Sequence, residues 1–454
     1  MSSLAIIPGS QVVPTIDSTD NTPGLLTARL IILSCVCFVA AASIGLLASI
    51  SVAFPDLFFT SASFTKLRPL HTFLSFSGIL SGMMALLNAI IGGDKSQADK
   101  SVDKGVIQFG LMLIFTLAGT VSIGLGYGSG REYISWSPLL SVFLILAIII
   151  STCKLFARLA ELSRRSPEGF WLIGAGMLFV VSGLIESHFW MFPTIGSNTI
   201  KDLSIQWHGL DTFVAGNSTV LYGCAIYMVQ NQPKAQRSSL LFTFSALVLL
   251  LSFGHHHYTS GQPLFLKMLA FCASMLAIVS LIRHARRFIE EKRQKNTSPE
   301  PTAPLFRAIE IWTLVSIISG VLFAIPQVNI YVHGTYAIVI HSMGSMIGIN
   351  LMIILAGGFK FSPDNGAQSA NAILLGTRLI NYSLSAMWLL LGAAGLVKGI
   401  LRIDTDYLVF QPKVQSLLVL FPLIGLFLLS GISLMCIQVI GLYRSPRKAD
   451  IAYV

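Results

Sequence analysis

Apolar stretches of about twenty residues recur along this chain from Leu26 to Leu442, and only short polar segments separate them. A helix of roughly 20 apolar residues crosses the hydrocarbon core of a bilayer. Of all residues, 54% are hydrophobic and only 11% are charged, unlike the composition of a soluble domain. The alternating pattern of a membrane barrel does not occur, and helices satisfy their own backbone hydrogen bonds in lipid. We therefore predict an all-α integral membrane protein.

The apolar stretches predict a bundle of about twelve transmembrane helices. They lie near residues 27–53, 69–91, 106–127, 138–160, 170–191, 204–230, 237–256, 263–286, 306–325, 334–357, 372–398 and 414–443. This pattern divides the chain into a flexible leader at residues 1–25, a single twelve-helix membrane domain at 26–443 and a tail at 444–454.

Lysines and arginines concentrate in every second polar segment, for example between Lys154 and Arg165 and between Arg283 and Arg307. By the positive-inside rule these segments are cytoplasmic, which places both termini and the tail on the cytoplasmic side. The net charge of +10 follows from these segments. It indicates contact with anionic membrane lipid rather than with nucleic acid.

Five of the nine histidines fall at a similar depth in the outer part of the predicted bundle: His71, His208, His256, His257 and His341. They come from four separate helices, and ionisable side chains within a membrane are costly and usually functional. Imidazole is a good ligand for iron and copper, so this convergence predicts heme or metal binding. His188 and His284 lie near membrane interfaces and are interpreted as ordinary residues, and His333 as a helix cap or a heme propionate contact.

Short motifs around these histidines resemble the catalytic subunit of the heme-copper oxidase superfamily, and within it the nitric oxide reductases. In chain order they are KLRPLHTFLSFSG at 66–78, GSGREYISW at 128–136, IQWHGLDTFVAG at 205–216, FGHHHYTSGQP at 253–263 and HGTYAIVIHSMGSMIGIN at 333–350. The resemblance extends over nearly the whole chain and implies two hemes, one low-spin and one high-spin, with a second metal facing the latter.

By this resemblance, His71 is the axial ligand of the low-spin heme, and His341 is the axial ligand of the high-spin heme. His208, His256 and His257 are the ligands of the second metal. His255 is then a spare ring of the histidine triplet, although His255 and His256 form the alternative pair.

Met343 stands where the family has a second histidine on the tenth helix. Residues i and i+2 point about 200° apart on a helix, so His341 and Met343 can serve a heme on either flank. A thioether is a competent axial ligand. We therefore predict ligation of the low-spin heme by His71 and Met343; the alternative is that Met343 only packs.

Two positions bear on the substrate. Oxygen reductases of the superfamily carry a tyrosine cross-linked to an active-site histidine, in one group four residues after the sixth-helix histidine, where this chain has Thr212. In another group it lies upstream of the seventh-helix pair, where this chain reads LVLLLS. Coupling of two NO molecules needs no such tyrosine, so the resemblance favours a nitric oxide reductase.

Three further residues carry charge near the predicted centre. The family's GREY element implies that Glu132 helps to bind calcium and that Arg131 lies near the heme propionates. Asp211, three residues after His208, lies on nearly the same helical face and is a further candidate metal ligand or proton relay. A carboxylate beside imidazoles favours non-heme iron over copper, and both remain candidates.

The resemblance implies an enzyme of the prokaryotic plasma membrane. None of the six cysteines forms a CxxCH motif, so covalent c-type heme attachment is excluded. Electrons then come from a cytochrome c subunit, a cupredoxin or a quinol. The alternatives are an oxygen-reducing terminal oxidase, a catalytically idle heme protein, and a twelve-span transporter.

Overall fold

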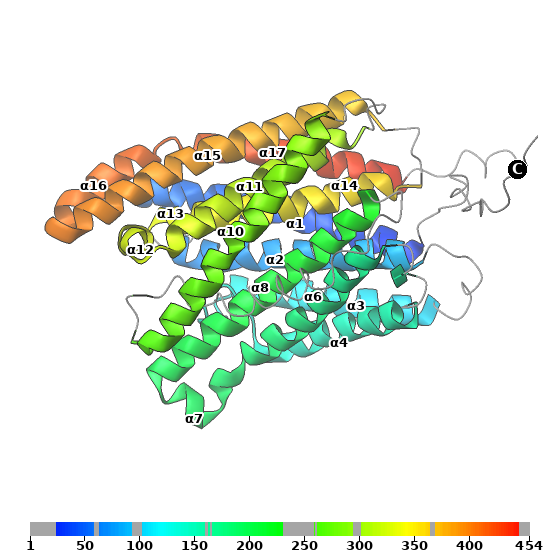
Figure 1. Cartoon of the computed structure of the whole chain (residues 1–454), viewed down its shortest axis with the longest axis horizontal. Helices are drawn as coiled ribbons and strands as arrows, with labels where there is room; N and C mark the ends of the chain where they lie inside the picture. Colours follow the sequence, from blue (N-terminus) through cyan, green and yellow to red (C-terminus); the bar gives the residue numbers. More distant parts are fainter. Residues whose placement is uncertain are drawn as a thin grey trace, which may run out of the picture.

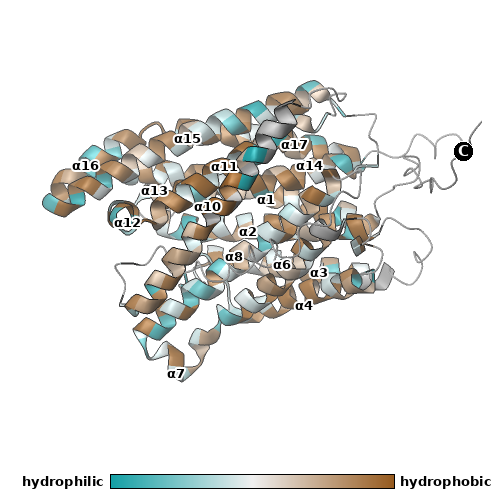
Figure 2. Ribbon diagram, in the orientation of Figure 1, coloured by the Kyte–Doolittle hydropathy of each residue, from teal (hydrophilic) through white to brown (hydrophobic). Residues whose placement is uncertain are grey.

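The computed structural model describes residues 24–58, 63–92, 102–158, 162–163, 166–229, 258, 261–293, 301–363 and 368–444. Long helices lie side by side along one direction, and none of these residues forms a β-strand (Figure 1). Apolar residues extend along most of each helix (Figure 2). This is the arrangement expected of a membrane bundle.

Ten long helices form most of the bundle. They are α1 (Leu25–Ala53), α2 (Phe64–Ile91), α3 (Val102–Gly124), α4 (Pro138–Ala157), α6 (Pro167–Glu186), α8 (Thr199–Val229), α10 (Leu264–Arg293), α11 (Ala303–Ala324), α15 (Ala370–Asp404) and α17 (Phe421–Arg444). A further segment joins α13 (Tyr336–Met343), the π-helix η5 (Gly344–Leu351) and α14 (Met352–Lys360). Short elements connect them: η1 (Pro55–Phe58), η3 (Phe189–Met191), α7 (Pro193–Gly196), α12 (Pro326–Val332) and α16 (Tyr407–Leu418).

Eleven segments within the described ranges are long and apolar enough to cross a membrane, which confirms the multi-span bundle. The remaining predicted span, residues 237–256, lies outside the described residues. Several helices continue past the predicted apolar stretch. For example, α15 extends to Asp404 rather than ending near 398, because a helix can continue beyond the hydrocarbon core, where water solvates its polar side chains.

Glycines place α6 and α8 in direct backbone contact. They recur at seven-residue intervals on both helices, at Gly169, Gly176 and Gly183 and at Gly209, Gly216 and Gly223. A Cβ added at Gly183 would stand 2.4 Å from the Phe213 nitrogen, and one at Gly216 would stand 2.6 Å from the Val180 nitrogen. Small residues are the usual means by which membrane helices approach closely. The glycines therefore fix how far α6 lies from α8.

The helices that carry the predicted ligands begin at the same end of the bundle. Figure 1 shows the starts of α2, α8 and α13 at the end where α7, α12 and α16 lie, opposite the C-terminus. His71, His208 and His341 each lie within about three turns of the start of their helix. The fold thus brings these three residues to similar depth, as the sequence predicts.

Candidate heme and metal centre

His71 lies on α2 and faces α1. Its Nδ1 is 2.7 Å from the backbone oxygen of Ala41. The opposing residue of α1 is Gly45, and a Cβ there would stand 2.8 Å from the ring. A carbonyl can only accept, so Nδ1 carries the proton, and Nε2 is the nitrogen that would bind iron. The missing side chain at Gly45 makes room for the imidazole.

His341 lies on α13 and has a similar environment. Its Nδ1 is 3.0 Å from the Ser319 hydroxyl, which itself donates to the Ser316 backbone oxygen at 3.1 Å. The Ser319 oxygen therefore accepts from Nδ1. A Cβ at Gly320 would stand 3.0 Å from the ring, and Phe323 contacts it edge-on. His341 is thus held by three consecutive turns of α11.

Met343 ends α13 and packs partly buried against the apolar core. The eight-residue π-helix η5 follows directly. Its Gly344 and Gly348 lie against the Trp312 ring, whose Nε1 donates to Asn381 at 2.8 Å. Such π-helical turns occur frequently at functional sites. Ligation by Met343 stays a prediction.

His208 lies on α8 and forms an ion pair with a residue that sequence reasoning did not select. Its Nδ1 is 2.8 Å and 2.7 Å from the two carboxylate oxygens of Glu186, the last residue of α6. Both side chains are mostly buried, with 26% of His208 and 23% of Glu186 exposed. An acidic residue near the end of the fifth apolar stretch is the signal that could have revealed it.

Two polar groups on the next turn of α8 complete this region. Asp211 interacts electrostatically with His208, and its Oδ2 is buried without a hydrogen-bond partner. The Thr212 hydroxyl is likewise buried and unpaired. Buried polar groups are nearly always satisfied, so each such atom needs an explanation. A metal ion or an ordered water bound near His208 would provide one.

The segment 128–137 covers this end of the bundle and carries two ion pairs. Glu132 pairs with Arg68, whose guanidinium also lies over the Tyr133 ring, 5.7 Å from its centre. Burial, and then the charge of Glu132, raises the pKa of Tyr133, and the charge of Asp211 acts in the same direction. Tyr133 adopts a left-handed φ of 64°, a strained state for a non-glycine residue and one that clusters at functional sites.

Arg131, from the same segment, reaches α8. Its Nη1 donates to both carboxylate oxygens of Asp202 at 2.8 Å and to Gln206 at 3.0 Å. The expected contacts of Arg131 with propionates and of Glu132 with calcium stay predictions. Calcium would compete with the Arg68 guanidinium for the Glu132 carboxylate.

His188 and His333 have the structural contacts expected of ordinary residues. The Nδ1 of His188 is 2.8 Å from the Leu184 oxygen, and its Nε2 is 3.1 Å from the Ser141 hydroxyl. The His333 backbone oxygen accepts from Arg402 at 2.7 Å at the end of α12. The side chain of His284 lies outside the described residues.

His255, His256 and His257 also lie outside the described residues. Within the described ranges, no three His, Cys, Asp or Glu side chains lie close enough together to hold a metal ion. The complete set of three imidazoles around a second metal therefore stays a prediction.

The residues that are described fit heme and metal ligation. His71, His208 and His341 each have Nδ1 hydrogen-bonded to an oxygen, and these oxygens belong to a backbone carbonyl, a carboxylate and a hydroxyl. Histidines that bind metals almost always hold their other ring nitrogen in this way. All three rings are also only partly buried by protein, which leaves part of each surface for another group.

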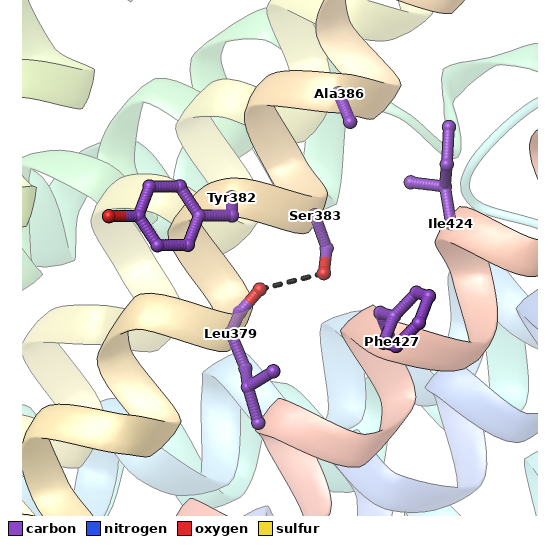
Figure 3. Close-up of a pocket in the computed structure, with 6 residues that line it drawn as sticks. All are labelled: Leu379, Tyr382, Ser383, Ala386, Ile424 and Phe427. Carbon is purple, nitrogen blue, oxygen red and sulfur yellow. Dashed lines mark hydrogen bonds between the residues drawn. The ribbon is translucent and has the colours of Figure 1, made fainter.

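A surface pocket lies away from this centre, between α15 and α17 (Figure 3). It is lined by Leu379, Tyr382, Ser383, Ala386, Ile424 and Phe427. The Ser383 hydroxyl is turned to its own helix, where it donates to the Leu379 oxygen at 2.7 Å. Such an apolar groove on an outer surface suits a lipid chain.

Comparison with known proteins identifies the family. Residues 26–428 match the family model described as cytochrome c and quinol oxidase polypeptide I. A curated relative, a nitric oxide reductase polypeptide of Stutzerimonas stutzeri, is 22% identical over 419 residues, which cover 81% of this chain and 83% of that protein. This multi-span chain therefore belongs to the cytochrome c and quinol oxidase polypeptide I family, whose members are membrane oxidoreductases with heme and metal cofactors.

Proposed function

We propose that this chain is the catalytic subunit of a nitric oxide reductase. Two NO molecules, two electrons and two protons give N2O and water. The observation that carries the proposal is Thr212, which stands one turn after His208 where one group of oxygen reductases has a tyrosine. The likeness to the nitric oxide reductase of Stutzerimonas stutzeri supports the same reaction.

Tyr258 does not supply the missing group. Its hydroxyl donates to the Ala324 backbone oxygen at 2.8 Å, at the end of α11. Burial, aided by the nearby Cys272, raises the pKa of Tyr258 to about 12, so this phenol stays protonated at neutral pH. A protonated phenol committed to a backbone carbonyl is poorly suited to deliver a proton and an electron.

Each candidate ligand has a defined task in this proposal. His71 and Met343 would hold the low-spin heme, His341 the high-spin heme, and His208, His256 and His257 the second metal. These groups supply the redox chemistry and the binding of NO, and iron is the preferred second metal because Asp211 adds a carboxylate. Asp211 would hold a proton at its unpaired Oδ2. Calcium at Glu132, with Arg131 near the propionates, completes the proposed cofactor set.

The setting is proposed on the same grounds. The protein would lie in a prokaryotic plasma membrane as one membrane domain, residues 26–443, with both termini cytoplasmic. Its electron donor would be a cytochrome c subunit, a cupredoxin or a quinol.

The test uses the purified full-length protein, its metal and heme content, and two electrodes. With a reduced donor we expect consumption of NO, two hemes and one non-heme iron per chain. Oxygen consumption with little NO consumption would establish the terminal oxidase instead, and inertness toward both gases would indicate a heme protein without catalytic activity.

A further inference from the structure

We propose that Glu186 is a positioning residue for the second metal: its carboxylate holds His208 through Nδ1 and so directs Nε2 toward the metal. This inference rests on the proposed function, because it takes His208 as a metal ligand. It extends that function by assigning a residue of α6, a helix that contributes no predicted ligand.

The geometry of the contact is well suited to this role. Both Glu186 oxygens lie within hydrogen-bond distance of the same ring nitrogen, at 2.8 Å and 2.7 Å. A carboxylate accepts from Nδ1–H, which fixes the tautomer and the orientation of the ring. It also makes the opposite nitrogen a stronger donor to a metal ion.

The backbone of α6 and α8 determines this contact. Glu186 follows Gly183 by one helical turn, and His208 precedes Gly209 directly. A Cβ at Gly209 would stand 2.7 Å from the Ser187 nitrogen, so the end of α6 lies against the turn of α8 that carries His208. Because main-chain atoms meet here, the reach of the Glu186 side chain is set by the helices themselves.

Charge gives the contact a further consequence. Thr212 leaves this chain without the carboxylate that typical nitric oxide reductases carry four residues after the sixth-helix histidine. Glu186 introduces an anion from a neighbouring helix on the far side of the His208 ring. A negative charge at this place favours a bound cation, so Glu186 and Asp211 together offset part of the metal's charge.

The test compares Fe2+ affinity among full-length, heme-loaded variants in detergent. The second metal is first removed with a chelator, and Fe2+ alone is then returned under anaerobic conditions against a competing chelator. We expect Glu186→Leu to bind Fe2+ about 10–100-fold more weakly than the unsubstituted chain, as for other lost outer-shell partners of metal ligands. Glu186→Gln, whose amide oxygen still accepts from Nδ1, should lose less.

Ser141→Ala is the matched control, because it removes a hydrogen bond from the neighbouring His188. It should bind Fe2+ within about twofold of the unsubstituted chain. The copper hyperfine coupling of bound Cu2+, measured by electron paramagnetic resonance, should change in both Glu186 variants and not in Ser141→Ala. The heme absorption bands report that each variant is folded, and the glutamine variant keeps the test valid should the leucine variant fail to fold.

Equal Fe2+ affinity and an unchanged Cu2+ spectrum in a folded Glu186 variant would overturn the inference alone, since the metal centre itself would stand. Failure of the unsubstituted chain to bind either metal while it retains heme would overturn the proposed centre and this inference with it. The two failures are therefore distinguishable.

Discussion

His188 and His208 lie close together where α6 meets α8, yet protein groups of different charge hold their rings. His188 contacts two neutral groups, the Leu184 carbonyl and the Ser141 hydroxyl, and that hydroxyl also accepts from the indole of Trp136 at 2.8 Å. His208 contacts the anionic carboxylate of Glu186. A neutral network that uses both ring nitrogens suits a structural histidine, and an anion on Nδ1 suits a ring that binds a cation.

The surroundings of the two rings differ in the same sense. Trp136, which lies beside the His188 network, is fully buried and packs edge-on against Phe73 and Phe115. The turn of α8 after His208 instead carries the unpaired polar atoms of Asp211 and Thr212. Proximity to the centre is therefore a poor guide to function, and the chemistry of the hydrogen-bond partners is a better one.

Substitution of His208 should give the largest effect. We expect His208→Ala to lower the rate of NO reduction by about 100-fold or more, because a second metal held by two ligands instead of three binds weakly. Metal analysis should show loss of the second metal with both hemes retained. Full metal content and normal turnover would remove the distinction between the two histidines.

Met343 asks whether the comparison extends to a ligand with no second nitrogen to anchor. If the thioether binds the low-spin heme, Met343→Leu should abolish the low-spin absorption band while the high-spin signal persists. We expect turnover to fall by roughly tenfold to a hundredfold, because electrons would reach the second metal slowly. An unchanged spectrum would show that Met343 only packs. Met346→Leu, on the same segment, is the control.

Asp211 separates proton handling from metal binding. We expect Asp211→Asn to reduce turnover by about tenfold while the second metal is retained, because the amide cannot hold or pass a proton. A parallel loss of metal would instead make Asp211 a ligand. Steady-state NO consumption and metal content, measured on the same preparation, distinguish these outcomes.

His188 should give the smallest effect on activity. We expect His188→Ala to leave metal content and turnover within about twofold, and to lower stability by about 1–3 kcal/mol, because it leaves buried hydrogen-bonding groups unsatisfied. Thermal unfolding followed through the heme absorption measures this. Loss of the second metal in this variant would contradict the structural assignment.

The sequence predicts much of this molecule because lipid imposes simple rules. Long apolar stretches predicted the multi-span bundle, and the alternation of spans predicted that His71, His208 and His341 lie at the same end. Both predictions are confirmed. The family resemblance is also confirmed, by the match over residues 26–428.

Helix pairing was beyond that reasoning. Hydropathy carries no information on which helices touch, so it could not bring Glu186 to His208 or Arg68 to Glu132. The seven-residue repeat of glycines on α6 and α8 holds part of this information. It was not recognised, because single glycines in an apolar helix are common and only the two repeats together indicate a contact.

The glycine contact between α6 and α8 bears on the energetics of electron transfer. Main-chain atoms meet across this interface, as the Gly183 and Gly216 positions show, so neither helix can shift without opening a gap in the apolar core. An acceptor site held by such a pair relaxes little when its charge changes. The two glycine repeats would thus keep the reorganisation energy at His208 low through rigidity alone.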